Sequence, residues 1–319
     1  MKFQRLLFVM MVPIFGVNAQ PNRAQLADYS LLNNPASAYH FERVELEATP
    51  PEGLKRVVFI GVAKHSPQGR KLPVLYALDG NALLGVLNLQ SVATLAARTR
   101  PPILVFLGYD TPKRLAVDER AYDYTPFVSK PGDIQIDALN PHRRNGGAGA
   151  YYTWITKTVR PYVEKHYAVD TQNTTLWGHS YGALFVLWAF LTDPGSFSHY
   201  VAADPSLWWH DQWLLKNQKR LIENVHLKSP VSLTIIRGLG TSPQPPRPDQ
   251  ARIDALRTVN SQWRDAFFRA LESIGSLRLT LQADPRFHHG SLLPASLLMT
   301  LDLPITVESP KSDASTNKE

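Results

Sequence analysis

The chain has 319 residues, 44% of them hydrophobic, which is enough for one large globular domain or two small ones. Its 34 basic and 27 acidic residues give a formal charge of +7, but no Lys/Arg run or nucleic-acid motif occurs. We therefore expect anionic small molecules as partners and no nucleic acid. Cysteine is absent, which excludes thiol catalysis and cysteine metal sites and fits an oxidising compartment.

The first residues have the pattern of an export signal. Lys2 and Arg5 precede an apolar run over 6–17, and a small residue, Ala19, ends the segment. The run is too short for a helix that spans a bilayer. We therefore predict a cleaved signal peptide over 1–19 and a periplasmic protein without a stable membrane anchor.

Strands and helices are predicted to alternate along the rest of the chain. Apolar or alternating runs predict strands over 41–48, 54–63, 72–78, 103–107, 174–177, 199–203, 231–237 and 277–282. Helical spacing predicts helices over 83–98, 151–167, 181–191 and 251–274, and a last helix from residue 292. This order indicates the α/β class, with a largely parallel sheet covered on both faces. We place one domain over 20–302 and a disordered polar tail over 303–319.

One long segment interrupts the alternation. Regular patterning disappears over 108–149, and a structureless stretch of that length inside a compact domain is usually a lid, a binding loop or disorder.

The sequence from Gly178 to Gly182 is a Gly-X-Ser-X-Gly motif between a predicted strand and a predicted helix. On such a strand-to-helix turn the serine hydroxyl protrudes from the backbone, so Ser180 is the predicted nucleophile. The helix that follows begins at Tyr181, and its free N–H groups and positive dipole end face the place where an oxyanion would form. The alternative is a chance match, since many such patterns carry no function.

Six segments resemble one family in the expected order. They are YALDGN (76–81), Arg120 with DYTP (123–126), Gly146-Gly147, LWGHSYG (176–182), PSLWW (205–209) and His289-Gly290. They are similar to the putative-esterase (esterase D) branch of the α/β-hydrolases and, within it, to periplasmic trilactone hydrolases of catecholate siderophores. The resemblance implies the α/β-hydrolase fold and ester hydrolysis.

The resemblance also indicates the base that activates the serine. A serine hydroxyl is a weak nucleophile until a histidine takes its proton. His288 and His289 lie where this fold supplies its base, and the family places that base directly before a glycine, so we prefer His289. His179 is adjacent to Ser180, but residues beside the serine of such a turn point away from it.

The acid of a triad is harder to assign. Hydrolases of this fold usually supply it after the strand that ends near Arg237, where the chain has no acid until Asp249. The siderophore hydrolases that this chain resembles are thought to use a Ser/His dyad. We therefore predict a dyad, and keep Asp249 and Asp204 as alternative acids.

An oxyanion hole needs two donors. The backbone N–H of Tyr181 is one, and the N–H of Gly80 or Asn81, in the loop after the third strand, is the other. The same loop can also be a simple turn.

Substrate contacts are predicted from charge and aromaticity. Arg120, Arg143 and Arg144 lie in the insertion and can bind catecholate oxygens, and Trp208 and Trp209 can stack on aromatic rings. Each of these residues can equally have a structural role. No metal site and no cofactor are predicted, because no His/Asp/Glu cluster has ligand spacing and any iron would arrive with the substrate.

These observations favour an exported serine esterase that cleaves the trilactone of a catecholate siderophore through an acyl-enzyme. One alternative is a carboxylesterase or acyltransferase that acts on carbohydrate or other small esters. Another is a non-catalytic binding protein for an anionic ligand.

Overall fold

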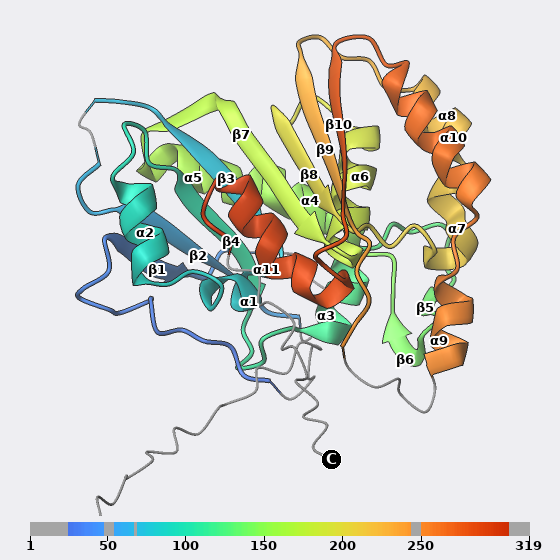
Figure 1. Cartoon of the computed structure of the whole chain (residues 1–319), viewed down its shortest axis with the longest axis horizontal. Coiled ribbons are helices and arrows are strands. Elements are labelled where there is room, and N and C mark those ends of the chain that lie inside the picture. Colours follow the sequence, from blue (N-terminus) through green and yellow to red (C-terminus); the bar gives the residue numbers. More distant parts are fainter. Residues whose placement is uncertain (1–24, 48–53, 67–68, 244–249, 306–319) are drawn as a thin grey trace, which may run out of the picture.

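The computed structural model describes residues 25–47, 54–66, 69–243 and 250–305 (Figure 1). The predicted signal peptide, Asp249 and all but the first three residues of the predicted tail lie outside these ranges. None of the helices within the described ranges has both the length and the apolar character needed to cross a membrane.

An eight-stranded sheet forms the centre of the molecule (Figure 1). Its strands are β1 (Tyr39–Val44), β2 (Arg56–Ala63), β3 (Leu72–Ala77), β4 (Ile103–Tyr109), β7 (Val169–His179), β8 (His199–Ala203), β9 (Val231–Gly238) and β10 (Leu277–Asp284). Their order in space is β1-β2-β4-β3-β7-β8-β9-β10. β2 runs antiparallel to β1 and β4, and every other neighbouring pair in this sheet is parallel. The predicted α/β class is confirmed.

Helices cover both faces of the sheet (Figure 1). One face carries α1 (Gly80–Leu84), α2 (Leu89–Ala96) and α11 (His289–Thr300). The other carries α4 (Ala148–Trp154), η1 (Ile155–Val159), α5 (Arg160–His166), α6 (Tyr181–Thr192), α7 (Trp209–Lys216), α8 (Gln218–Glu223) and α10 (Ser261–Glu272). A strand such as β4, which is buried along its whole length, therefore contributes to an apolar core on each side.

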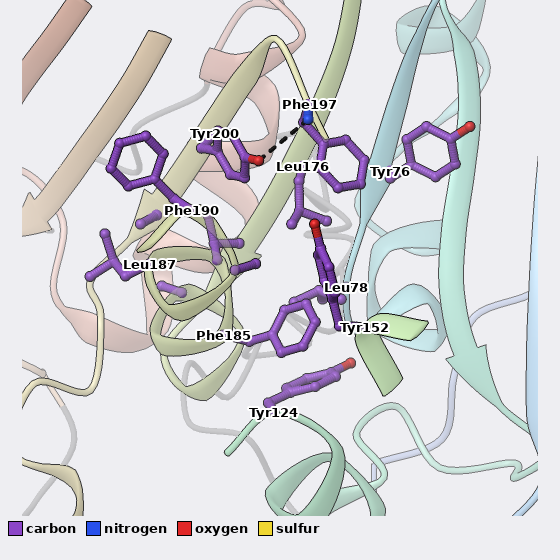
Figure 2. Packing of buried hydrophobic residues seen from close by; sticks show 14 of the residues in the cluster. Tyr76, Leu78, Tyr124, Tyr152, Leu176, Phe185, Leu187, Phe190, Phe197 and Tyr200 are labelled. Carbon is purple, nitrogen blue, oxygen red and sulfur yellow. Dashed lines mark hydrogen bonds between the residues drawn. The ribbon is translucent and has the colours of Figure 1, made fainter. Parts of the chain in front are cut away.

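α6, which begins directly after the predicted nucleophile, is deeply buried. Ten of its 12 residues are buried, as expected for a helix that is apolar all round. The ring of Phe185 lies 5.4 Å from that of Tyr151, centroid to centroid. It lies 6.1 Å from the ring of Tyr124, beside which Figure 2 shows it. Because Tyr124 belongs to the insertion, the first turns of α6 are held between the sheet and the insertion.

Three expectations about individual elements were wrong. The insertion over 108–149, where no regular element was predicted, contains α3 (Val117–Asp123), β5 (Ile136–Asp137) and β6 (Asn140–Arg144), and α4 begins within it. Elements this short show little hydrophobic periodicity in the sequence. The helix predicted over 83–98 is two helices, and Asn88 caps the second. The helix predicted over 251–274 is α9 (Gln250–Arg257) followed by α10, which begins after the capping residue Asn260. In both places an asparagine side chain accepts from a backbone N–H of the second helix.

A buried ion pair ties the insertion to the sheet. Arg56, on β2, donates two hydrogen bonds of 2.8 and 2.6 Å to the carboxylate of Asp123, at the end of α3. Both side chains are fully buried, and the Tyr109 hydroxyl donates a third bond of 3.1 Å to the same carboxylate. The start of the insertion is therefore fixed to the sheet.

We expect Asp123→Asn to lower the free energy of unfolding by about 3–5 kcal/mol, because it leaves the buried guanidinium of Arg56 without a counter-charge. Urea denaturation followed by circular dichroism measures the change. Asp170→Asn, which breaks the more exposed pair with Arg100, is the matched control and should cost less than about 1 kcal/mol. Equal losses in the two variants would contradict this account.

Candidate active site

Ser180 occupies a strained turn between β7 and α6. Its φ of 61° and ψ of −117° lie outside the regions that non-glycine residues usually adopt, which is common at functional sites. A Cβ atom on Gly178 would approach the carbonyl oxygen of Gly182 to 2.4 Å, so this turn requires glycine at 178. Gly182 is less constrained, since a Cβ there would meet Leu78 at 3.3 Å.

A chain of hydrogen bonds joins three side chains from distant parts of the sequence. Ser180 Oγ lies 3.1 Å from Nε2 of His289, and His289 Nδ1 lies 2.6 Å from Oδ2 of Asp204. With Nδ1 protonated, the imidazole donates to the carboxylate and leaves Nε2 free to accept from the serine hydroxyl. The structure thus brings the predicted nucleophile and base together.

The structure also places a carboxylate, that of Asp204, behind the histidine, where the predicted Ser/His dyad has none. Asp204 follows β8, the strand beside β7, and a φ of 48° turns the chain there toward α11. Asp204 is one of the two alternative acids, at a place one strand earlier than this fold usually supplies its acid. Asp249, the other alternative, lies outside the described residues.

The two consecutive histidines have different roles. His288 is the N-cap of α11, and its Nδ1 accepts a hydrogen bond of 3.2 Å from the N–H of Gly290. The hydroxyl of Ser291 accepts from the N–H of His288, which completes a capping box. His289 is therefore held at the first position of a helix, three residues earlier than the helix start predicted from the sequence.

His179 holds the backbone of His289, the predicted base, through a hydrogen bond. It lies buried beside Ser180, and its Nε2 donates a hydrogen bond of 2.8 Å to the backbone carbonyl of His289. Burial, together with the nearby His289, lowers the pKa of His179 well below its usual value of 6.5, so the ring stays neutral in the folded protein. The residue before the nucleophile thus positions the backbone of the base.

The neutral state of His179 predicts a pH dependence of stability. Below pH 6.5 the unfolded chain binds a proton at this residue and the folded chain does not, so stability falls as the pH drops from 6.5 toward the lower, folded-state pKa. The loss is at most about 1.4 kcal/mol per pH unit. Urea denaturation between pH 7 and pH 5 should show a smaller loss for His179→Gln, whose amide can still donate. The exposed His142→Gln is the control, and an unaltered profile in His179→Gln would contradict the prediction.

The residues predicted to form the oxyanion hole lie at the starts of two helices, α6 and α1. Tyr181 is the first residue of α6, so its N–H has no partner within the helix. Gly80 and Asn81 begin α1, after Asp79 in a left-handed conformation with φ 61°. The Asn81 side chain is occupied by hydrogen bonds to Tyr29 and to the backbone of Tyr109 and Thr111, so the predicted second donor is a backbone N–H, that of Asn81 or Gly80. A carboxylate oxygen of Asp79 lies 3.8 Å from the place of a Cβ on Gly182, so this loop adjoins the start of α6.

Comparison with known proteins gives the family. Residues 53–272, more than half of the chain, match the putative esterase family. The chain belongs to this family.

Similar proteins act on siderophores. The apo-salmochelin esterase of Escherichia coli O6:H1 is 32% identical over 193 residues, which cover 60% of this esterase and 58% of that relative. The siderophore enterobactin esterase of Emericella nidulans is 30% identical over 252 residues, 72% of this chain and 80% of the relative. The structure of the enterobactin and salmochelin hydrolase IroE superposes with a TM-score of 0.63 at 26% identity, over 83% of this chain and 94% of that one. The predicted α/β-hydrolase fold is confirmed.

Most side chains predicted to bind the substrate of this esterase have structural partners. Arg120 donates to both carboxylate oxygens of Asp79, at 2.7 and 2.8 Å, and only 11% of its side chain is exposed. Arg143 is buried and paired with Asp118. Arg120 of α3 therefore holds the loop after β3 through Asp79, and Arg143 is occupied by its own ion pair.

The two tryptophans also differ. Trp209 is buried and donates from Nε1 to the side chain of Asn145 at 2.9 Å, so it cannot stack on a ligand. Trp208 is half-buried, with its ring 5.6 Å from that of Tyr181. With the exposed Arg144, it remains available for a substrate.

Three residues that neighbour predicted site residues were not predicted from the sequence. Ser206 is buried, and its hydroxyl lies 3.3 Å from Ser180 Oγ. Its position in the PSLWW motif is the sequence feature from which it could have been predicted. Arg257 lies over Trp208, and Arg114 follows β4; neither has a local sequence signal. No group of three or more His, Asp or Glu side chains suited to a metal ion occurs within the described ranges.

Proposed function

We propose that this esterase is a serine hydrolase in which Ser180, His289 and Asp204 form a catalytic triad. The observation that carries the proposal is the continuous hydrogen-bond chain from Ser180 Oγ through the imidazole to Asp204. His289 takes the serine proton through Nε2 while the oxygen attacks the ester carbonyl carbon, and the Asp204 carboxylate stabilises the resulting imidazolium.

The negative charge that develops on the carbonyl oxygen is bound by two N–H groups, that of Tyr181 and that of Gly80 or Asn81. The positive end of the α6 dipole favours the same charge. The tetrahedral intermediate collapses to an acyl-enzyme, and His289 returns the proton to the leaving alcohol. Water, activated by the same histidine, then releases the acid.

The proposed substrate is the trilactone of a catecholate siderophore, cleaved so that iron is released. The named relatives act on enterobactin or salmochelin, and at 30–32% identity they support this substrate class. The formal charge of +7 suits such an anionic ligand. The iron belongs to the substrate and is not a cofactor of the enzyme.

We further propose that the reaction takes place in the periplasm, after removal of residues 1–19. The basic start, apolar run and small residues of this segment support export. Osmotic-shock fractions of the expressing cell should contain a protein whose first residue is Gln20.

The decisive experiment incubates the purified protein with apo and ferric enterobactin and follows linear products by mass spectrometry. Linear trimer, dimer and monomer are expected, together with labelling of the Ser180 peptide by diisopropyl fluorophosphate. Hydrolysis of small nitrophenyl or carbohydrate esters without cleavage of enterobactin would favour the broader carboxylesterase or acyltransferase. Ligand binding without turnover or labelling would favour a binding protein.

A further inference from the structure

The sheet order places Ser180 between a loop that carries a cationic side chain, Arg114, and a loop that carries an aromatic one, Trp208. β4, β3, β7 and β8 are parallel neighbours in that order, so their carboxyl ends open at the same edge of the sheet. Ser180 follows β7, Arg114 lies after β4, and Trp208 lies after β8. The arginine and the tryptophan therefore lie on opposite sides of the nucleophile.

On the β8 side, a guanidinium covers an aromatic ring close to the serine. The ring of Trp208 lies 5.6 Å from that of Tyr181, which is adjacent to Ser180 in the chain. Arg257, in the last turn of α9, is exposed and has its Cζ 5.5 Å from the centre of the Trp208 ring. An aromatic face beside a planar guanidinium suits a flat group that carries negative charge.

On the β4 side, Arg114 brings charge without a counter-ion. It is half-buried, and no ion pair or side-chain hydrogen bond of its guanidinium occurs among residues 25–47, 54–66, 69–243 and 250–305. Burial lowers its pKa, an effect that the nearby Asp79 opposes, but a guanidinium stays charged in proteins. Both carboxylate oxygens of Asp79 are already bound by Arg120, so this side keeps excess positive charge.

A partly buried cation without a partner costs free energy, and an incoming anion would recover it. A simple alkyl ester brings no such charge. An ester with negative groups in both its acyl and its alcohol parts would place one on each side of the serine.

We propose that Arg114 and the Trp208–Arg257 pair are two substrate subsites on opposite sides of Ser180, which bind negatively charged groups in the two parts of the ester. This inference rests on the proposed function and deepens it. It defines the substrate by charge on both sides of the bond that is cleaved, and it assigns each charge to a named side chain.

The test compares three synthetic esters. 4-Nitrophenyl acetate is neutral, mono-4-nitrophenyl glutarate carries its charge in the acyl part, and 4-acetoxybenzoate carries it in the alcohol part. Arg114→Met and Arg257→Met should each lower the ratio of kcat/KM for one anionic ester to that for the neutral ester by about tenfold, through KM. Arg114→Met should lower the ratio for one of the two anionic esters and Arg257→Met the ratio for the other. Arg257→Lys should recover part of the ratio.

Exposed neighbours provide matched controls. Lys113→Met, beside Arg114, and Arg252→Met, on the same helix as Arg257, should leave the ratio unchanged. Salt should reduce the selectivity of the wild type, because it screens partly exposed charges. An unchanged ratio in both arginine variants, or an equal loss in the controls, would overturn the inference.

A binding measurement separates this inference from the proposed function. In a Ser180→Ala background, calorimetry with 2,3-dihydroxybenzoylserine should give a Kd about tenfold weaker for Arg114→Met or Arg257→Met. If the wild type fails to cleave enterobactin but the arginine variants lose affinity or selectivity, the substrate proposal fails and the subsites stand. If enterobactin is cleaved and neither affinity nor selectivity changes, the subsites fail and the proposed function stands.

Discussion

Ser180→Ala is expected to lower kcat for ester hydrolysis by about 10⁴- to 10⁶-fold, because it removes the only atom that can form the acyl-enzyme. The fold should not change. Alanine keeps the Cβ, so the strain at φ 61° is the same, and within the described part of the chain the lost hydroxyl is hydrogen-bonded to His289 and Ser206 alone. Initial rates with 4-nitrophenyl acetate and a thermal unfolding curve measure the two quantities.

The pairing of Ser180 with His289 makes this loss non-additive. His289→Ala should cost nearly as much as Ser180→Ala, and the double variant should cost little more than either, since each removes the same step. His288→Asn is the control, because asparagine is also a good N-cap and should keep α11 in place. A large loss of activity in His288→Asn with His289→Ala active would reverse the assignment of the base.

The nucleophile could be predicted because its signal is local. Five consecutive residues specify the turn, and the steric reason is visible in the 2.4 Å approach of a Cβ on Gly178 to Gly182. The alternation of strands and helices predicted the sheet for a similar reason, since each buried strand is a short apolar run. The choice of His289 over His288 depended on the family resemblance. In the structure His288 caps α11, and His289 is the first residue of that helix.

The acid and the substrate residues could not be predicted in the same way. Asp204 and His289 are 85 positions apart, and the contact exists because Asp204 turns at φ 48° after β8. Nothing in the sequence distinguishes the exposed Arg144 from the buried Arg143, which differ only in the side of the β6 strand that they occupy. Arg257 and Trp208 are 49 positions apart, and only the folded chain brings them together.

Asp204→Asn is expected to lower kcat by about 10²- to 10⁴-fold. The carboxylate accepts the Nδ1 proton of His289 at 2.6 Å, which holds Nε2 unprotonated toward Ser180. An asparagine of the same shape can present its NH₂ group instead, which favours the tautomer with the proton on Nε2. Such an imidazole cannot take the serine proton. The charge that stabilises the imidazolium is lost as well.

A comparison with Asp249→Asn decides between the possible arrangements. If Asp204 completes the triad, Asp249→Asn keeps wild-type kcat, and Asp204→Asn loses activity while it retains its thermal stability. If Asp204→Asn keeps kcat within about tenfold of wild type, the 2.6 Å contact only orients the ring and the enzyme works as a Ser/His dyad. Pre-steady-state kinetics with 4-nitrophenyl acetate add a second criterion. Because the acid supports proton transfer in both half-reactions, Asp204→Asn should slow the release of the first 4-nitrophenol as well as the steady-state rate.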